Sequence, residues 1–310
     1  MVGASFAAGL VKTTGQALKI GIVDARPPAI LKDCVARSQP DARVYALSPK
    51  SRRFLFDIGA MSLVEDNRRS MPYHDMQVWE SEGPGLVRFS ANQMGLPELG
   101  VIAEDSTIQA SCFAALHANS EATGSTPELI LDSTVVGLHS DKSPSDNAFT
   151  SASASASDAP VQVTLQNSSG RQRVVGARLV VGADGGNSAV RRLAGIPTWG
   201  WGYGQRALVA TVRTQAPGHG HATAWQVYLP SGPLALLPLW DGYSSIVWSM
   251  SVEQATHVGA LGAETFQELL NEALTRPPQT QQWTSAARNG TAEGRFMDSP
   301  LSVLRREVGH

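Results

Sequence analysis

Residues Leu179–Arg191 read L-V-V-G-A-D-G-G-N-S-A-V-R, an apolar run that ends in an acid and two glycines. The run Ala177–Ala183 predicts a buried strand that carries Asp184 at its carboxyl end, and Gly185 lets the backbone approach a ligand closely. Ser188 is suited to cap a following helix, whose N-terminus favours phosphate. The segment predicts that Asp184 binds sugar or ribityl hydroxyls near a pyrophosphate, with a plain Asp-Gly turn between strand and helix as the alternative.

The start of the chain carries a second dinucleotide signal. Met1–Ala17 is small and apolar, which predicts a helix packed closely on a sheet, and Leu18–Asp24 predicts a buried parallel-type strand that ends in an acid. Asp24 follows Gly3 by 21 residues, close to the roughly 20-residue offset at which an acid reaches a ribose hydroxyl in dinucleotide-binding folds. An Asp that merely ends a strand is the alternative.

The remaining patterns predict an α/β part followed by a mostly antiparallel part. Ser48 at the N-cap and Pro49 at the first helical position favour a helix to residue 58. The Ser-rich stretch 140–160 is polar and repetitive, which predicts a disordered surface insertion. Further helices are predicted at 104–119 and 262–274, and strands at 129–131, 135–138, 161–165, 208–213, 224–229, 234–239 and 244–250.

The composition excludes several classes of protein. The net charge is −2, from 25 basic and 27 acidic residues, which argues against a nucleic-acid binder that neutralises many phosphates. Cys34 and Cys112 are far apart and are expected to be reduced thiols, and the seven histidines form no metal-ligand cluster, so no metal site is predicted. No apolar run approaches the roughly 18–20 residues needed to span a bilayer.

Five segments together resemble a known family. G-A-D-G-G-N-S-A-V-R, residues Gly182–Arg191, is similar to the Asp-Gly motif of the single-component flavoprotein hydroxylases, which include para-hydroxybenzoate hydroxylase. The closer resemblance is to the ubiquinone-biosynthesis monooxygenases of that group, and it runs in order from Met1 to about Leu274. It is carried by Arg43–Ser48 (R-V-Y-A-L-S), Met76–Glu80 (M-Q-V-W-E), Ala224–Leu239 (A-W-Q-V-Y-L-P-S-G-P-L-A-L-L-P-L) and Ser244–Ser249 (S-S-I-V-W-S).

The resemblance implies FAD as cofactor and an α/β fold, with an FAD-binding Rossmann-like domain and an antiparallel-sheet substrate domain. Residues 1–64 and 101–198 would form the FAD-binding parts, with the insertion at 140–160, and residues 65–100 and 199–310 the substrate domain, left incomplete. The family has a glycine-rich strand turn before the position of Met1 and a second flavin-binding segment beyond that of His310. The resemblance therefore implies a chain cut short at both ends.

The resemblance also implies roles for single residues. Gly3 resembles the last glycine of the FAD fingerprint and Asp24 the ribose acid, while Arg43 reaches the FAD phosphate or flavin and Gln109 contacts the cofactor from a helix. Asp184 and Gly185 would hold the ribityl chain or the pyrophosphate side. The floor of the substrate cavity would be formed by Trp225, Tyr228, Leu236 and Trp248, for each of which core packing is the alternative.

The implied activity is hydroxylation of the aromatic ring of a prenylated phenolic ubiquinone precursor through a flavin hydroperoxide, with no catalytic base on the protein. Electrons would come from ferredoxin and ferredoxin reductase. The protein would act with other ubiquinone-biosynthesis proteins in mitochondria, peripherally on the matrix side of the inner membrane. One alternative is an NAD(P)H-dependent hydroxylase of a small aromatic acid, and another is an inactive fragment with a binding or scaffold role.

Overall fold

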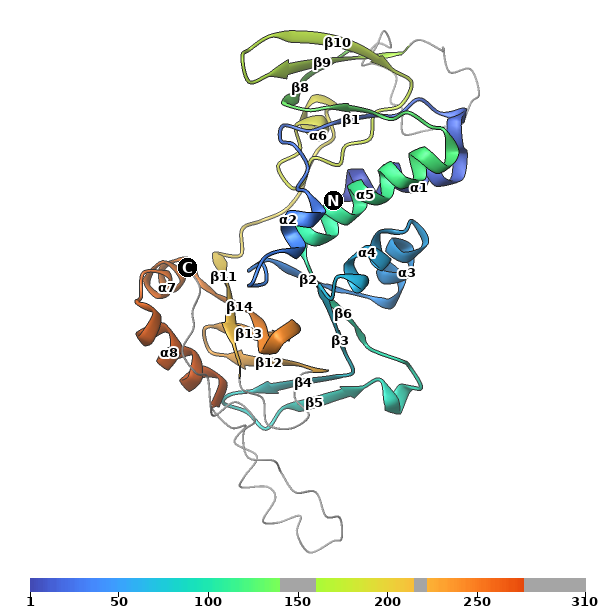
Figure 1. Cartoon of the computed structure of the whole chain (residues 1–310). Coiled ribbons are helices and arrows are strands. Elements are labelled where there is room, and N and C mark those ends of the chain that lie inside the picture. Colours follow the sequence, from blue (N-terminus) through green and yellow to red (C-terminus); the bar gives the residue numbers. More distant parts are fainter. Residues whose placement is uncertain (140–159, 215–221, 276–310) are drawn as a thin grey trace, which may run out of the picture. The chain divides into compact units, whose positions relative to one another are not determined.

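The computed structural model describes residues 1–139, 160–214 and 222–275. The chain forms two compact units (Figure 1): the first unit comprises residues 1–29 and 112–201, and the second unit comprises residues 30–111 and 202–310. The insertion predicted at 140–160 lies, apart from Pro160, outside the described residues. The division into FAD-binding and substrate parts that the sequence suggests stays a prediction.

The first unit begins with the predicted helix and strand, both shorter than expected. The prediction that this strand is buried is wrong, since Gly21 is exposed and Ile22 and Val23 are half-buried. Helix α1 (Val2–Thr14) ends where Gly15 adopts a φ of 56°, a conformation that glycine adopts readily. Strand β1 (Gly21–Val23) pairs in parallel with β7 (Glu128–Ile130). The small residues of α1 permit close packing, and its buried positions recur at helical spacing: Ala4, Ser5, Ala7, Ala8 and Val11.

A three-stranded antiparallel sheet completes the first unit, in the order β10 (Gln172–Ala177), β9 (Val161–Asn167), β8 (Ser133–His139). The prediction of a buried strand over Ala177–Ala183 is wrong, because β10 ends at Ala177 and Leu179 is 77% exposed. A strand requires a hydrogen-bonded neighbour. Among the described residues no strand pairs with this segment, and β1 pairs only with β7. The turn after it leads into the short helix α6 (Ala189–Leu193).

The second unit contains a three-stranded antiparallel sheet with β6 (Gly100–Glu104) between β2 (Val44–Leu47) and β3 (Ser70–Tyr73). Helix α5 (Asp105–Thr123) continues directly from β6 and passes into the first unit. The predicted cap of α3 (Pro49–Asp57) is confirmed, since the Ser48 hydroxyl accepts a hydrogen bond from the amide of Ser51 at 3.2 Å. The other helices of this region are α2 (Leu31–Val35) and α4 (Ala60–Asp66).

The predicted strands after residue 208 form most of a six-stranded sheet, which confirms the antiparallel second part. Within this sheet the β12–β4 pair is parallel and the other described pairs are antiparallel. The order across the sheet is β11 (Gln205–Arg213), β14 (Tyr243–Ser251), β13 (Gly232–Pro238), β12 (Thr223–Leu229), β4 (Asp75–Glu80) and β5 (Leu86–Ser90).

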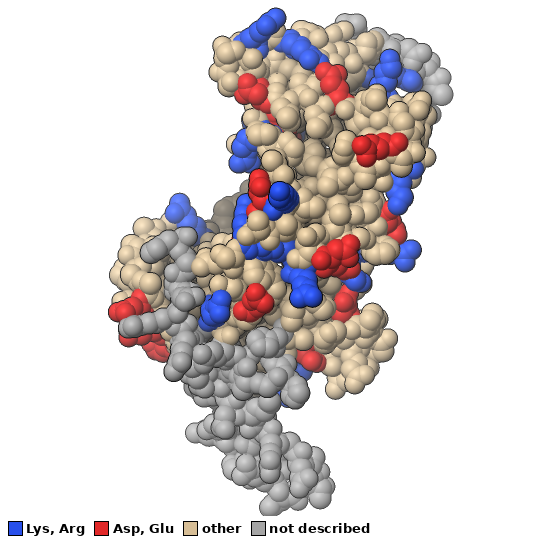
Figure 2. Space-filling model, in the orientation of Figure 1, with Lys and Arg blue, Asp and Glu red and all other residues tan. Residues whose placement is uncertain are grey.

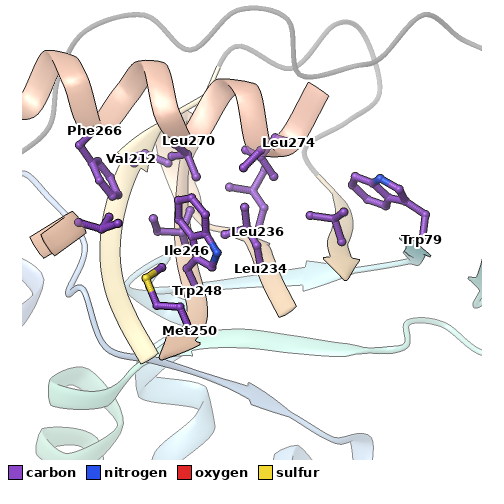
Figure 3. Close-up of a cluster of buried hydrophobic side chains, with 13 residues drawn as sticks. Trp79, Val212, Leu234, Leu236, Ile246, Trp248, Met250, Phe266, Leu270 and Leu274 are labelled. Atoms are coloured by element: carbon purple, nitrogen blue, oxygen red, sulfur yellow. The ribbon is translucent and has the colours of Figure 1, made fainter. Parts of the chain in front are cut away.

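Two helices, α7 (Val252–Gly259) and α8 (Ala263–Thr275), cover one face of this sheet with a continuous hydrophobic core. In Figure 3 the α8 side chains Phe266, Leu270 and Leu274 lie over the strand residues. Each large apolar side chain that is fully buried contributes about 1.5–3 kcal/mol. Successive strand residues point to opposite faces, so only every second residue of each strand joins this core.

Among the described residues no helix has both the length and the apolar character needed to cross a bilayer. Within the same ranges no three His, Cys, Asp or Glu side chains gather in a way that could hold a metal ion. On the face shown in Figure 2, acidic and basic side chains are interspersed, in keeping with a net charge of −2.

Candidate functional site

The turn between Ala183 and α6 is built around the carboxylate of Asp184. Its Oδ1 accepts a hydrogen bond from the Ser188 hydroxyl at 2.5 Å, and its Oδ2 accepts from the amides of Ala189 at 2.7 Å and Val190 at 3.1 Å. Gly185 has a φ of 83°, and no described atom lies within 4 Å of where its Cβ would stand. The turn therefore presents an acid beside open, side-chain-free backbone.

These hydrogen bonds keep Asp184 ionised. Burial acts to raise the pKa of Asp184, but the bonds from the Ser188 hydroxyl and the backbone amides outweigh it, so the pKa lies below its ordinary value. The Ser188 cap of α6 is confirmed, with the Arg191 amide donating to its hydroxyl at 2.9 Å. The amides of Ala189 and Val190 donate to Asp184, however, so these two groups are not available to a phosphate.

Gly3 and Asp24 are the other residues of the first unit that the sequence predicts to contact the cofactor. A Cβ on Gly3 would stand 3.4 Å from the Cβ of Ala183, which is ordinary van der Waals contact, so α1 lies close to the Ala183 segment. Asp24 directly follows β1, where its amide donates to the Ile130 carbonyl at 3.1 Å. Its exposed carboxylate accepts from the Arg26 amide at 3.0 Å. Close helix packing and two placed carboxylates fit the sugar hydroxyls of a dinucleotide.

In the second unit the structure brings Arg43 and Gln109 to the same neighbour, Asp105. The Asp105 amide donates to the carbonyl of Arg43 at 3.1 Å, and the Gln109 side chain donates from Nε2 to Asp105 Oδ1 at 2.9 Å. The guanidinium carbon of Arg43 lies 5.5 Å from the ring centroid of Tyr45, and the side chain is exposed. An exposed guanidinium on fixed backbone suits a phosphate group.

The four predicted substrate residues lie on two different faces of the six-stranded sheet. Leu236 and Trp248 belong to the core under α8, and Trp225 packs against that core with its ring edge-on to Trp79, 6.4 Å between centroids. Core packing, the stated alternative, describes these three. Tyr228 lies three residues from Trp225 and so points to the opposite face, where it is 49% exposed. Side chains alternate between the two faces along β12, and this alternation in the sequence distinguishes Tyr228 from Trp225.

Sequence reasoning missed a buried charge pair in the second unit. Glu104, the last residue of β6, is fully buried and lies 3.4 Å from the guanidinium of Arg69, itself only 5% exposed. The signal in the sequence is the acid that ends the apolar run G-V-I-A-E at 100–104. Its partner is separated from it by 35 positions and has no comparable pattern around it.

Comparison with known proteins supports the cofactor. A family model described as "FAD binding domain" matches residues 147–292. Ubiquinone biosynthesis monooxygenase COQ6 of Mus musculus is 35% identical over 267 residues, which is 86% of this chain and 49% of the relative. The 3-demethoxyubiquinol 3-hydroxylase of Escherichia coli is 32% identical over 249 residues, 80% of this chain and 54% of the relative. The chain thus spans about half the length of these curated relatives.

Solved structures show the same fold. A probable FAD-dependent monooxygenase from Pseudomonas aeruginosa, pqsL, aligns with a TM-score of 0.60 at 20% identity, over 92% of this chain and 68% of its own. The p-nitrophenol 4-monooxygenase PnpA of Pseudomonas putida aligns with a TM-score of 0.58 at 15% identity, over 90% and 61%. The fold is that of the FAD-dependent monooxygenases, which confirms the predicted fold class. The predicted resemblance to the ubiquinone-biosynthesis monooxygenases is confirmed by the curated relatives.

Proposed function

We propose that the chain is part of an FAD-dependent monooxygenase that hydroxylates the aromatic ring of a prenylated phenolic ubiquinone precursor. The observation that carries the proposal is the match to a ubiquinone biosynthesis monooxygenase along 86% of the chain. The Asp184 turn and the Gly3–Ala183 approach support it independently, because both suit a dinucleotide.

In this proposal the first unit contributes hydrogen-bond acceptors to the cofactor. Asp24 would accept from the adenosine ribose and Asp184 from the ribityl hydroxyls, while Gly185 leaves the backbone open beside them. From the second unit, Arg43 would pair with a phosphate and Gln109 would contact the cofactor from α5. Bound FAD supplies the activation of oxygen, and the protein's own share is to bind, to orient and to exclude water.

The proposed substrate surface, or open face, is the part of the six-stranded sheet around β12, β4 and β5 on the side away from α8. Strand pairing places Tyr228 opposite Glu80 and Val78 opposite Val87, so Tyr228, Val87 and Phe89 share the face that α8 does not cover. The two apolar side chains are about half exposed, at 51% and 46%. An aromatic ring beside Tyr228 with an apolar tail across β5 would bury surface that is otherwise in water.

The finer assignments belong to the same proposal. Mitochondrial relatives support a mitochondrial location, and we place the protein peripherally on the matrix side of the inner membrane, with other ubiquinone-biosynthesis proteins. Ferredoxin and its reductase are the proposed electron source, and direct reduction by NAD(P)H is the competing route.

The test is whether the purified chain retains FAD after incubation and desalting. The expected result is a yellow protein with a flavin absorbance spectrum, and an Asp24→Asn/Asp184→Ala double variant treated in the same way should retain much less. A colourless wild-type chain would refute the proposal that this chain is itself a flavoenzyme and would leave a binding or scaffold role.

The second stage separates substrates and electron sources. Anaerobic bleaching of the bound flavin by reduced ferredoxin, and not by NAD(P)H, is expected. Oxygen uptake should then rise with a prenylated phenol more than with a small aromatic acid such as 4-hydroxybenzoate. The reverse preference in both assays would instead identify an NAD(P)H-dependent hydroxylase of small aromatic acids.

A further inference from the structure

A polar cluster built on a buried ion pair lies inside the second unit. Glu104 Oε1 accepts a hydrogen bond from the indole nitrogen of Trp240 at 2.8 Å and faces the Arg69 guanidinium at 3.4 Å. The Trp240 ring lies against that guanidinium, with 4.3 Å from its carbon to the ring centroid. Removing two charges from water is expensive unless every remaining lone pair and proton is satisfied. The remaining hydrogen bonds of Arg69 and Glu104 therefore show which part of the main chain this ion pair holds in place.

The remaining bonds of the ion pair go to the main chain between α2 and β2. Arg69 donates from Nη2 to the carbonyl of Val35, at 2.5 Å, and to the carbonyl of Arg37. Glu104 Oε2 accepts from the amide of Asp41 at 2.8 Å. The cluster thus holds the main chain from the last residue of α2 to Asp41, through both carbonyl and amide groups.

The end of this segment is also fixed from the six-stranded sheet. The Thr211 hydroxyl donates to the carbonyl of Asp41, and the Ser245 hydroxyl donates to the carbonyl of Ala42, each at 3.2 Å. Thr211 and Ser245 are cross-strand partners on β11 and β14. The main chain leading to Arg43 is therefore held from two sides while the Arg43 side chain stays exposed.

We propose that Glu104 is a positioning residue that fixes residues 41–43 and thereby the point from which Arg43 reaches the cofactor. The part concerning the cofactor rests on the proposed function. A buried ion pair is on average no more stabilising than apolar residues of the same volume. An apolar replacement, however, would fill the space without offering the Asp41 amide an acceptor or the two carbonyls a donor.

Two variants probe the cluster with different severity. Glu104→Gln retains the shape but has one acceptor oxygen. That oxygen should stay toward the two donors, the Arg69 guanidinium and the Trp240 indole, so the Asp41 amide loses its acceptor. Trp240→Phe is gentler, because it keeps a ring against Arg69 and removes only the indole donor to Glu104. Ile246→Val, in the core of the same unit, is the matched control, since it trims packing without touching the cluster.

Hydrogen–deuterium exchange of a peptide covering residues 38–45 tests the positioning without any cofactor. A hydrogen bond to a charged group is worth about 1.5–3 kcal/mol, so Glu104→Gln should speed exchange of the Asp41 amide roughly 10- to 100-fold. A smaller increase is expected for Trp240→Phe, and none in this peptide for Ile246→Val. Unchanged exchange in Trp240→Phe and in folded Glu104→Gln would overturn the proposal.

Titration with FAD tests the consequence for the cofactor. The dissociation constant should rise about tenfold in Glu104→Gln, equivalent to about 1.4 kcal/mol, less in Trp240→Phe, and not in Ile246→Val. An equal rise in Ile246→Val would show that affinity follows general stability and would refute the positioning role. If the wild-type chain binds no FAD, the proposed function fails, and the exchange result alone decides whether Glu104 holds residues 41–43.

Discussion

Comparison of Asp184→Ala with Ser188→Ala separates the proposed cofactor role of Asp184 from its structural role at the start of α6. Three hydrogen bonds end on the Asp184 carboxylate, one from the Ser188 hydroxyl and two from the amides of Ala189 and Val190. Loss of a helix cap costs about 0.5–2 kcal/mol, so the melting temperature should fall by roughly 2–8 °C. Ser188→Ala is the matched control, since it removes the cap on Arg191 and leaves the carboxylate in place.

The two variants should differ in FAD affinity although they are similarly destabilised. A charge-assisted hydrogen bond contributes about 1.5–3 kcal/mol, so its loss in Asp184→Ala should raise the dissociation constant roughly 10- to 100-fold. Ser188→Ala should stay within about threefold of the wild type. Flavin fluorescence titration and thermal unfolding, measured on the same preparations, give both quantities. Equal losses of affinity would mean that Asp184 acts only through the helix, and our assignment of it to the ribityl hydroxyls would be wrong.

The lowered pKa of Asp184 fixes the pH range in which its cap stabilises the chain. Burial opposes ionisation, but the hydrogen bonds outweigh it and favour the charged form in the folded chain. Its stabilisation is therefore complete above the ordinary aspartate pKa of about 3.9 and is lost as the pH falls through the lower folded value. The difference in unfolding free energy between wild type and Asp184→Asn should stay constant down to roughly pH 5 and shrink below it. Urea unfolding at a series of pH values measures this difference, and a gap that widens in acid would contradict the sign.

Four further predictions concern Asp24, Tyr228, Trp248 and Cys112. Asp24→Asn keeps an acceptor for the Arg26 amide and removes the charge, so FAD should bind about tenfold more weakly in fluorescence titration, at unchanged melting temperature. Tyr228→Ala, on the open face, should raise KM for a prenylated phenol and alter stability by less than about 0.5 kcal/mol. Trp248→Phe, which removes a buried indole N–H without a partner in the described structure, should leave KM unchanged; the opposite pattern of KM changes would reverse the assignment of the two sheet faces. Burial raises the pKa of Cys112 to about 11, so about one thiol in a thousand is ionised at pH 8, and this buried thiol should react with a disulfide reagent only after unfolding.

Local sequence signals predicted the elements whose stability is local. The Ser48 cap, the helix that follows β6 and the antiparallel strands after residue 205 each depend on capping or on alternation within a short window. The prediction of a buried strand over Ala177–Ala183 is wrong for the opposite reason. The apolar residues of this segment satisfy the pattern of a buried strand, but strand formation depends on a neighbour that the pattern does not contain, and no described strand pairs with it.

The candidate site shows the same division. The sequence indicates Asp184 as a candidate because the acid, the two glycines and the capping Ser188 lie within a few residues of one another. The family resemblance assigned the four substrate residues as one group. The structure divides the group between two sheet faces, because Trp225 and Tyr228 are an odd number of positions apart on one strand. The Glu104–Arg69 pair could not be read from either residue alone, since a lone acid at a strand end has many possible partners.

The two candidate cofactor segments are the turn at Asp184 and residues 41–43. In each, hydrogen bonds to main-chain groups fix the segment, while a side chain or a glycine backbone stays exposed. In the first unit, the amides after Asp184 bind its carboxylate, and the glycine beside it stays uncovered. In the second unit, the carbonyls and amide of residues 41–42 are bound by buried or half-buried polar groups, and Arg43 projects from them. Substitution of Arg43 itself should therefore change affinity at little expense in stability, whereas substitution of Glu104 changes where the arginine stands. Arg43→Ala and Glu104→Gln therefore separate loss of the guanidinium from displacement of the main chain that carries it.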